Sequence, residues 1–258
     1  MTLSVIIPSH NDIYLHKTID SLLENAAGDI EIIPVIDGYE PSNPFRDDPR
    51  IKVVKHDKNK GMREAINTGV FASTGEYIMR TDEHCMFGER FDIILLETIQ
   101  DNWIVVPRRY FLDPLKWEVM DLPYVDYEKL KIVSYGRGEK FSGVKWDKPE
   151  GENYDIDETM AMQGSCWVMK KSWWESVIRR LESEGYDTLY QDSHEMIFKT
   201  WKAGGKMVVN KRTWYAHKHR SFPRTHGYGG EKADKCFAHS LNVWRDYYEN
   251  EIVPVWQM

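Results

Sequence analysis

Residues 75–84 read Gly75-Glu76-Tyr77-Ile78-Met79-Arg80-Thr81-Asp82-Glu83-His84, a strand pattern that ends in metal-ligand residue types. The first part is typical of a buried strand, and Asp82 and His84 follow at its carboxyl end, where both can point into one crevice. Mn²⁺ accepts a carboxylate and an imidazole as ligands, and such an ion could hold a diphosphate. The alternative is that Asp82 and His84 cap a helix beginning near Gly88 or Glu89.

Length and composition are those of an ordinary globular protein. With 258 residues, of which 41% are hydrophobic and 29% charged, the chain can form one large α/β domain or two small ones. The formal net charge of −7 does not favour polyanionic partners. Three cysteines without a CxxC pair favour a reducing compartment, and no signal peptide or span-length apolar segment is recognisable. We therefore expect a cytoplasmic location.

The first part of the chain alternates between strand and helix patterns. Continuous apolar runs predict strands buried on both faces, and the segments between them carry apolar residues on one helical side. This order, with short turns, predicts an α/β fold with a mainly parallel, Rossmann-like sheet flanked by helices. Strands are predicted over residues 3–8, 30–36, 51–55, 77–80 and 103–107, and helices over 15–25, 61–73 and 91–100.

Regularity decreases over residues 108–157, where we expect long loops with short antiparallel strands. Regular patterns return with a short apolar run at Cys166. Beyond this point, strands are predicted over residues 166–169, 207–209 and 213–216, and helices over 171–184, 193–203 and 232–249.

Several short motifs follow one another along the chain. They are Val5-Ile6-Ile7-Pro8-Ser9-His10-Asn11, Val35-Ile36-Asp37-Gly38, Asn59-Lys60-Gly61-Met62-Arg63-Glu64-Ala65-Ile66-Asn67, Asp82-Glu83-His84-Cys85, Gln163-Gly164-Ser165-Cys166, Gln191-Asp192-Ser193-His194-Glu195 and Ala216-His217-Lys218-His219-Arg220. In this order they resemble glycosyltransferases of the GT-A fold, family 2-like. The metal region is especially similar to that of the polypeptide N-acetylgalactosaminyltransferases. The resemblance covers roughly residues 3–230.

This resemblance implies a hexosyltransferase that moves a sugar from a nucleotide-diphosphate donor to an acceptor hydroxyl. A UDP-sugar is favoured over a GDP-sugar, with Mn²⁺ or Mg²⁺ as the metal. It also implies a GT-A domain over residues 1–230, with a nucleotide-binding half of about 1–107 and an acceptor-side half of about 108–230. We expect the C-terminal helix and tail, 231–258, to pack on the same domain.

By the same resemblance, Asp82, His84 and His217 would be the protein ligands of the metal. The alternative for His217 is membership of a basic cluster with its neighbours Lys218, His219 and Arg220. In the family, the position of Arg220 lies near the diphosphate, where a guanidinium could bind the leaving group. Ordinary surface charge is the alternative for this residue.

The donor-binding residues implied by the resemblance lie mainly at strand ends. Asp37 would accept a hydrogen bond from the base or a ribose hydroxyl, although Asp37-Gly38 is also a plain turn sequence. Arg63 would contact the base or phosphate, with a helix-surface position as its alternative. The full set is Pro8, Ser9, Asn11, Asp37, Arg63, Thr81, Asp82, Glu83 and Arg220.

Asp192 and Glu195 are the candidate catalytic carboxylates. In inverting relatives the carboxylate matching Asp192 is the general base, whereas in retaining relatives it contacts the donor sugar. A helix N-terminus would keep Asp192 ionised, and the residue could also serve as an N-cap. Glu195 could equally be a first-turn charge, and Gly164 would allow close backbone approach to a sugar.

The acceptor is less defined. His84 stands in place of the second Asp of D-x-D, and a peptide acceptor does not carry over, so a bacterial or phage enzyme acting on a saccharide, a lipid-linked glycan or modified nucleic acid is expected. The basic, aromatic stretch 206–235 suggests hydroxymethylated DNA. The loop 221–230 resembles a lid or is a plain connection. The alternative functions are a catalytically silent nucleotide-sugar-binding module and a nucleotidyltransferase.

Overall fold

A computed structural model of the chain describes residues 1–11, 13–186, 190–218 and 230–256. The first part alternates between strands and helices, as its apolar pattern predicts. Its elements are β1 (Thr2–Ser9), α1 (Leu15–Asn25), β2 (Asp29–Asp37), β3 (Val54–His56), α2 (Met62–Ala72), β4 (Tyr77–Thr81), β5 (Cys85–Phe87), α3 (Phe91–Leu96) and β6 (Trp103–Asp113).

The second part contains more regular structure than expected. Residues 108–157, expected to be mainly loops, continue β6 and form a long antiparallel hairpin of β8 and β9. The elements are β7 (Glu118–Val119), β8 (Glu128–Tyr135), β9 (Gly138–Lys145), a 3₁₀ helix (Pro149–Asn153), β10 (Ile156–Glu158), β11 (Cys166–Lys170), α4 (Lys171–Trp173), a π-helix (Trp174–Ile178), α5 (Asp192–Lys202), β12 (Lys206–Lys218), α6 (Glu231–Tyr247), a second π-helix (Tyr248–Ile252) and α7 (Val253–Val255).

Several predicted boundaries are wrong. The helix expected over 91–100 ends at Leu96, and the strand expected over 51–55 is β3, Val54–His56. The helix expected over 171–184 ends at Ile178, because Arg179 has a φ of 62° and cannot continue a right-handed helix. The two strands expected over 207–209 and 213–216 form the single strand β12, which carries an irregularity between Asn210 and Trp214.

The central sheet is mixed and mainly parallel, in the order β10-β12-β6-β11-β4-β1-β2-β3, with β5 on β12 and β7 on β6. Strands β4, β1, β2 and β3 run parallel, as do β12 and β6, whereas β11 runs antiparallel between β4 and β6. The predicted α/β class, with a mainly parallel sheet flanked by helices, is confirmed.

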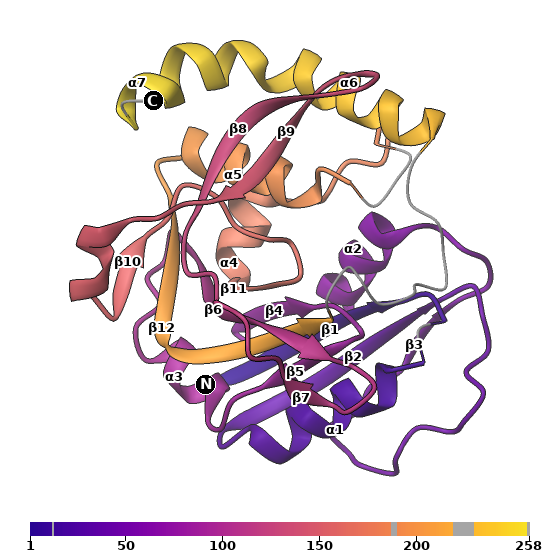
Figure 1. Ribbon diagram of the computed structural model, residues 1–258. Helices are drawn as coiled ribbons and strands as arrows, with labels where there is room; N and C mark the ends of the chain where they lie inside the picture. The colour runs from indigo at the N-terminus through magenta and orange to yellow at the C-terminus, as the bar shows by residue number, and fades with distance from the viewer. Residues whose placement is uncertain (12, 187–189, 219–229, 257–258) are drawn as a thin grey trace.

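Helices cover both faces of the sheet, as Figure 1 shows. Alternate residues of β1 explain this arrangement, because Leu3 and Val5 belong to the core with α1 and α3, and Ile6 belongs to the core with α2 and α5. Strand β1 is therefore apolar on both sides, which is the pattern expected of an interior parallel strand.

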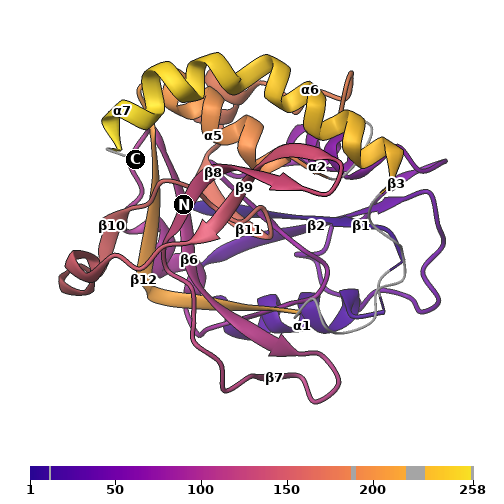
Figure 2. The ribbon, with the colours of Figure 1, turned by 45° about the horizontal axis from the view of Figure 1, so that its top comes forward.

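The β8–β9 hairpin lies outside the main sheet and packs with α5 and α6 (Figures 1 and 2). Phe141 of β9 contacts Phe198 of α5 and Tyr248, with ring centroids 4.9 and 5.4 Å apart. Trp244 of α6 stacks on Phe198 at 5.1 Å. The C-terminal helix is thus joined to α5 and the hairpin by one aromatic cluster. Among the described residues, no helix is long and apolar enough to cross a membrane.

Strand directions bring the candidate site residues to one region. The parallel strands β1, β2 and β4 end at Ser9, Asp37 and Thr81, so their carboxyl ends share one edge. The antiparallel strand β11 begins beside Thr81, with Cys166 as its register partner. The loop 163–165 therefore lies next to the Asp82-Glu83-His84 segment.

Candidate active site

Asp82, His84 and His217 converge although they come from distant parts of the chain. Strand β5 pairs antiparallel with β12, which places His217 opposite Cys85 and next to His84. The Nε2 atom of His217 lies 3.1 Å from Nε2 of His84 and 2.9 Å from Oδ2 of Asp82. His84 Nε2 and Asp82 Oδ2 are 3.8 Å apart. One ligand atom from each residue thus lies within 4.8 Å of the others, a group that could hold a metal ion.

The protonation states of this group suit cation binding. Burial raises the pKa of Asp82, but the charge of Arg80 and the hydrogen bond from His217 outweigh it, so the pKa lies well below its usual range. Burial lowers the pKa of His217 to about 4, although its contact with Asp82 acts in the opposite direction. At neutral pH the group therefore offers an ionised carboxylate and a neutral imidazole, the forms that bind metals.

The helix-cap alternative for Asp82 and His84 is wrong. The next helix, α3, begins at Phe91, and its N-cap position is Arg90 in a left-handed conformation. Strand β5 separates Asp82 and His84 from that helix. Their side chains face His217 instead.

Arg80 is a functional candidate that sequence reasoning missed. It lies on β4, is buried, and donates from Nη2 to Oδ1 of Asp82 at 2.5 Å. Its Nη1 donates to the carbonyl of Gly164. The signal available in the sequence was a charged residue directly after the apolar run Tyr77–Met79 in the same predicted strand, because an arginine is rarely fully buried unless it is paired.

Ser9 and Glu83 connect the end of β1 to the metal-ligand segment. The Ser9 hydroxyl donates to Glu83 and also contacts the hydroxyl of Tyr39, and the His10 amide donates to Glu83 Oε1 at 3.2 Å. Thr81 is fully buried, so its hydroxyl faces the interior. The contacts of Ser9, Thr81 and Glu83 with a donor remain predictions.

Pro8, Asn11 and Asp37 lie at the same sheet edge. Pro8 is half-buried on β1, and Asn11 is exposed with a φ of 65°. The carboxylate of Asp37 accepts from His56 Nδ1 at 2.7 Å and from the backbone amides of Lys60 and Gly61 at 2.8 Å each. Asp37 thus fixes the segment that leads into α2, and its contact with a base or ribose remains a prediction.

Asp192 is the first residue of α5 and is buried beside Gly164. A Cβ atom added to Gly164 would lie 3.3 Å from Asp192 Oδ2 and 3.4 Å from Oδ1. Among the described residues, Oδ2 has no hydrogen-bond partner. Burial outweighs the opposing charge of Arg80 and raises the pKa of Asp192, so the helix end alone does not set its ionisation. Gln191 occupies the N-cap position.

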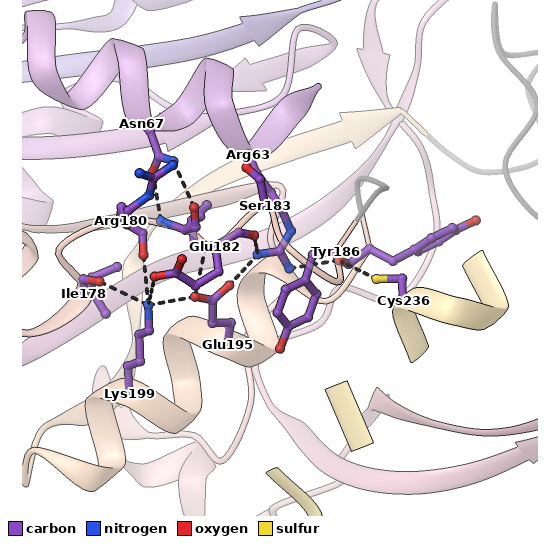
Figure 3. Close-up of polar contacts among 12 residues, drawn as sticks. Arg63, Asn67, Ile178, Arg180, Glu182, Ser183, Tyr186, Glu195, Lys199 and Cys236 are labelled. Carbon is purple, nitrogen blue, oxygen red and sulfur yellow. Dashed lines mark hydrogen bonds and ion pairs between the residues drawn. The ribbon is translucent and has the colours of Figure 1, made fainter. Parts of the chain in front are cut away.

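Glu195 and Arg63 bond to each other instead of joining the metal-ligand group (Figure 3). Glu195 also forms an ion pair with Lys199 Nζ at 2.7 Å. Arg63 donates hydrogen bonds to the carbonyls of Glu182 and Tyr190 at 3.0 Å each. Both side chains are buried. This network joins α2 to α5, and the donor contact of Arg63 and the catalytic role of Glu195 remain predictions. Arg220 and residues 221–229 of the predicted lid at 221–230 lie outside the described residues.

A comparison with protein-family models identifies the domain. The model described as "Glycosyl transferase family 2" matches residues 4–177, which is more than half of the chain. The chain belongs to glycosyl transferase family 2.

Curated relatives of this family 2 chain include animal and bacterial glycosyltransferases. Polypeptide N-acetylgalactosaminyltransferase 10 of Rattus norvegicus is 22% identical over 275 residues, covering 96% of this chain and 43% of the relative. The uncharacterised glycosyltransferase EpsJ of Bacillus subtilis is 40% identical over 82 residues, covering 29% of this chain and 24% of EpsJ. The chain thus spans less than half the length of these relatives.

A solved structure shares the fold of the family 2 chain. The crystal structure of GalNAc-T7 with UDP, GalNAc and Mn²⁺ superposes with a TM-score of 0.74 at 17% identity. The match covers 98% of this chain and 50% of GalNAc-T7. The predicted GT-A fold is confirmed by this likeness.

Proposed function

We propose that this family 2 chain is a metal-dependent glycosyltransferase that moves a sugar from a UDP-sugar to an acceptor hydroxyl. The observation that carries this proposal is the convergence of Asp82, His84 and His217 at the sheet edge where the parallel strands end. In α/β sheets this edge is the usual place for nucleotide ligands. We place the donor half of the domain in residues 1–107 and the acceptor half in 108–230.

The residues present fit a divalent cation of the Mn²⁺ type. The three residues offer one carboxylate oxygen and two imidazole nitrogens. Mn²⁺ accepts both kinds of ligand and is therefore preferred here over Mg²⁺, which favours oxygen ligands. Asp82, His84 and His217 would hold the ion. When bound, the metal would neutralise charge on the diphosphate of the donor as it leaves.

Asp192 is positioned to receive a hydroxyl group. Its Oδ2 is buried and lacks a partner among the described residues, and Gly164 leaves room beside it because it carries no side chain. A bound sugar hydroxyl would donate to this oxygen. If the hydroxyl belongs to the acceptor, Asp192 would take its proton as the hydroxyl oxygen attacks the anomeric carbon of the donor sugar. If the hydroxyl belongs to the donor sugar, Asp192 would orient that sugar.

The relatives support UDP as the donor nucleotide. GalNAc-T7, which shares the fold over 98% of this chain, was solved with UDP, GalNAc and Mn²⁺. The alignment with polypeptide N-acetylgalactosaminyltransferase 10 covers 96% of this chain at 22% identity. A UDP-sugar is therefore the donor that we expect first, ahead of a GDP-sugar.

We propose a saccharide hydroxyl as the acceptor in preference to hydroxymethylated DNA. In the described part of the basic stretch, Lys206 pairs with Glu158, and Arg212 pairs with Glu97. Tyr215 is buried and bonds to Ser165 at 2.8 Å, so it is not available to stack on a base. These contacts engage two of the positive charges and one of the aromatic rings that would serve nucleic-acid binding.

The test is hydrolysis and transfer from a panel of nucleotide sugars with Mn²⁺, followed for the wild type, Asp82→Ala and Asp192→Asn. We expect turnover of a UDP-sugar that EDTA abolishes and Asp82→Ala eliminates. Asp192→Asn should lower turnover by about 10²- to 10⁴-fold. An active preparation in which neither substitution lowers turnover would contradict the proposal.

Two further outcomes separate the alternatives. Nucleotide-sugar binding without turnover under all conditions would favour a silent binding module. Binding to duplex or single-stranded DNA that falls steeply with salt would favour a nucleic-acid acceptor, whereas no binding at low salt would exclude it.

A further inference from the structure

Arg80 is a buried cation between the two carboxylates of the proposed site. It belongs to strand β4 and is only 2% exposed. The positive charge of its guanidinium acts on both Asp82 and Asp192, and the two carboxylates in turn raise the pKa of Arg80 against the effect of burial. A buried arginine is stable only where its charge is compensated, so its position is tied to these two groups.

The guanidinium contacts three segments of the chain at once. Nη2 donates to Oδ1 of Asp82 at 2.5 Å and lies 3.1 Å from the sulfur of Met62, the first residue of α2. Nη1 donates to the carbonyl of Gly164 in the loop before β11. The two arms therefore connect the metal-ligand segment to the loop 163–165.

These contacts divide the two oxygens of Asp82 between different partners. Oδ1 accepts from Arg80, whereas Oδ2 faces His217 at 2.9 Å and His84 at 3.8 Å. The arginine thus sets the rotation of the carboxylate and directs Oδ2 toward the imidazoles. On its other arm it holds Gly164, where an added Cβ would lie 3.3 Å from Asp192 Oδ2.

We infer that Arg80 is a positioning residue that uses its two-armed guanidinium to orient Asp82 toward the metal and Gly164 against Asp192. This inference rests on the proposed function, because it assigns a role within the same site. The fork geometry is essential to it, since a lysine offers one ammonium and cannot hold the carboxylate and the carbonyl in the same planar arrangement. Partners of metal ligands are known to alter metal affinity by 10- to 100-fold.

The experiment compares Arg80→Lys and Arg80→Gln with Arg63→Lys as a matched control. Arg63 is also a buried, ion-paired arginine, 3% exposed, but its partner is Glu195, which lies outside the metal-ligand group (Figure 3). Mn²⁺ binding to the protein without nucleotide is measured by the loss of the free Mn²⁺ signal in electron paramagnetic resonance. Thermal unfolding is recorded for every variant.

We expect Arg80→Lys and Arg80→Gln to raise the Kd for Mn²⁺ by about 10- to 100-fold. The Arg63→Lys variant should lose thermal stability and keep the wild-type Kd. A wild-type Kd in Arg80→Lys would overturn the inference, because it would show that positive charge alone suffices. An equal loss of Mn²⁺ affinity in Arg63→Lys would also overturn it, since the effect would then be a general result of destabilisation.

Mn²⁺ binding by the wild type and by Asp82→Ala tests the proposed function independently of the Arg80 variants. If the wild type binds Mn²⁺ and Asp82→Ala does not, the proposed metal site stands whatever the Arg80 variants do. If the wild type binds no Mn²⁺, both the proposed function and this inference fall.

A crystal structure of the wild type with Mn²⁺ provides a test that does not depend on variant folding. The inference requires Arg80 to remain on Oδ1 of Asp82 while the ion lies on Oδ2. An ion bound through Oδ1, with the guanidinium turned away from Asp82, would overturn it.

Discussion

His84 and His217 are 133 residues apart in the chain, and their Nε2 atoms lie 3.1 Å from each other. If both Nε2 atoms were protonated, their N–H groups would point at each other and repel at this distance. Since Asp82 Oδ2 lies 2.9 Å from the same nitrogen of His217, a cation is a natural partner for all three atoms.

Replacing His217 with alanine should weaken Mn²⁺ binding by at least about 100-fold, because it removes one of three protein ligands. Titration of the free Mn²⁺ signal measures the effect. His16→Ala is the control, since His16 contacts Phe45 and is not part of the ligand group. Equal affinities for His217→Ala and the wild type would remove His217 from the metal site.

Glu195→Gln should destabilise the fold without changing Mn²⁺ affinity. The substitution removes the negative partner of the buried Arg63 and should lower the free energy of unfolding by about 3 kcal/mol. Urea unfolding measures this free energy. Glu64→Gln is the control from the same region, because Glu64 pairs with the exposed Arg180 and should cost less than about 1 kcal/mol. Loss of turnover in Glu195→Gln at unchanged stability would instead support its predicted catalytic role.

Gly164→Ala should lower turnover by about tenfold while leaving the melting temperature nearly unchanged. The new methyl group would lie 3.3 Å from Asp192 Oδ2 and displace the carboxylate by a small distance. Gly136→Ala is the control, because its added Cβ would meet no atom within 4 Å. Steady-state kinetics with the preferred donor would decide, and wild-type turnover in Gly164→Ala would argue against close approach of a hydroxyl to Asp192.

His194 should make the stability depend on pH. Burial, together with the charges of Arg63 and Lys140, lowers the pKa of His194 to about 4 from its ordinary 6.5. Because the unfolded chain then binds more protons than the folded chain between these values, stability falls as the pH drops through this window. Between pH 7 and pH 5, the wild type should lose about 2 kcal/mol more than His194→Gln in urea unfolding. An identical loss in both proteins would show that His194 titrates normally.

The sequence predicted the fold well because buried strands and one-sided helices leave local patterns. The runs around Val5 and Ile78 and the spacing of Ala65 and Ile66 are examples, and both strands and the helix form where expected. The meeting of His217 with Asp82 followed from the family resemblance, since no local pattern reports a contact between residues so far apart.

What the sequence could not predict depends on long-range pairing. The ion pair of Arg63 with Glu195 joins residues 132 positions apart in the chain, and no local pattern predicts it. The contact of Arg80 with the Gly164 carbonyl arises only when β4 and β11 lie side by side, so the sequence alone does not reveal it. The raised pKa of Asp192 likewise follows from burial by surrounding segments. Its position at a helix N-terminus predicts only the opposite effect, a carboxylate that stays ionised.

Strand β12 has a consequence for how the protein matures. It lies between β10 and β6, and its last residues include His217. During synthesis on the ribosome, the segment between β4 and β5 that supplies Asp82 and His84 emerges long before β12 does. A divalent cation held by the proposed ligands Asp82, His84 and His217 would therefore meet its full set only after this late strand has been inserted, and metal uptake would report that insertion.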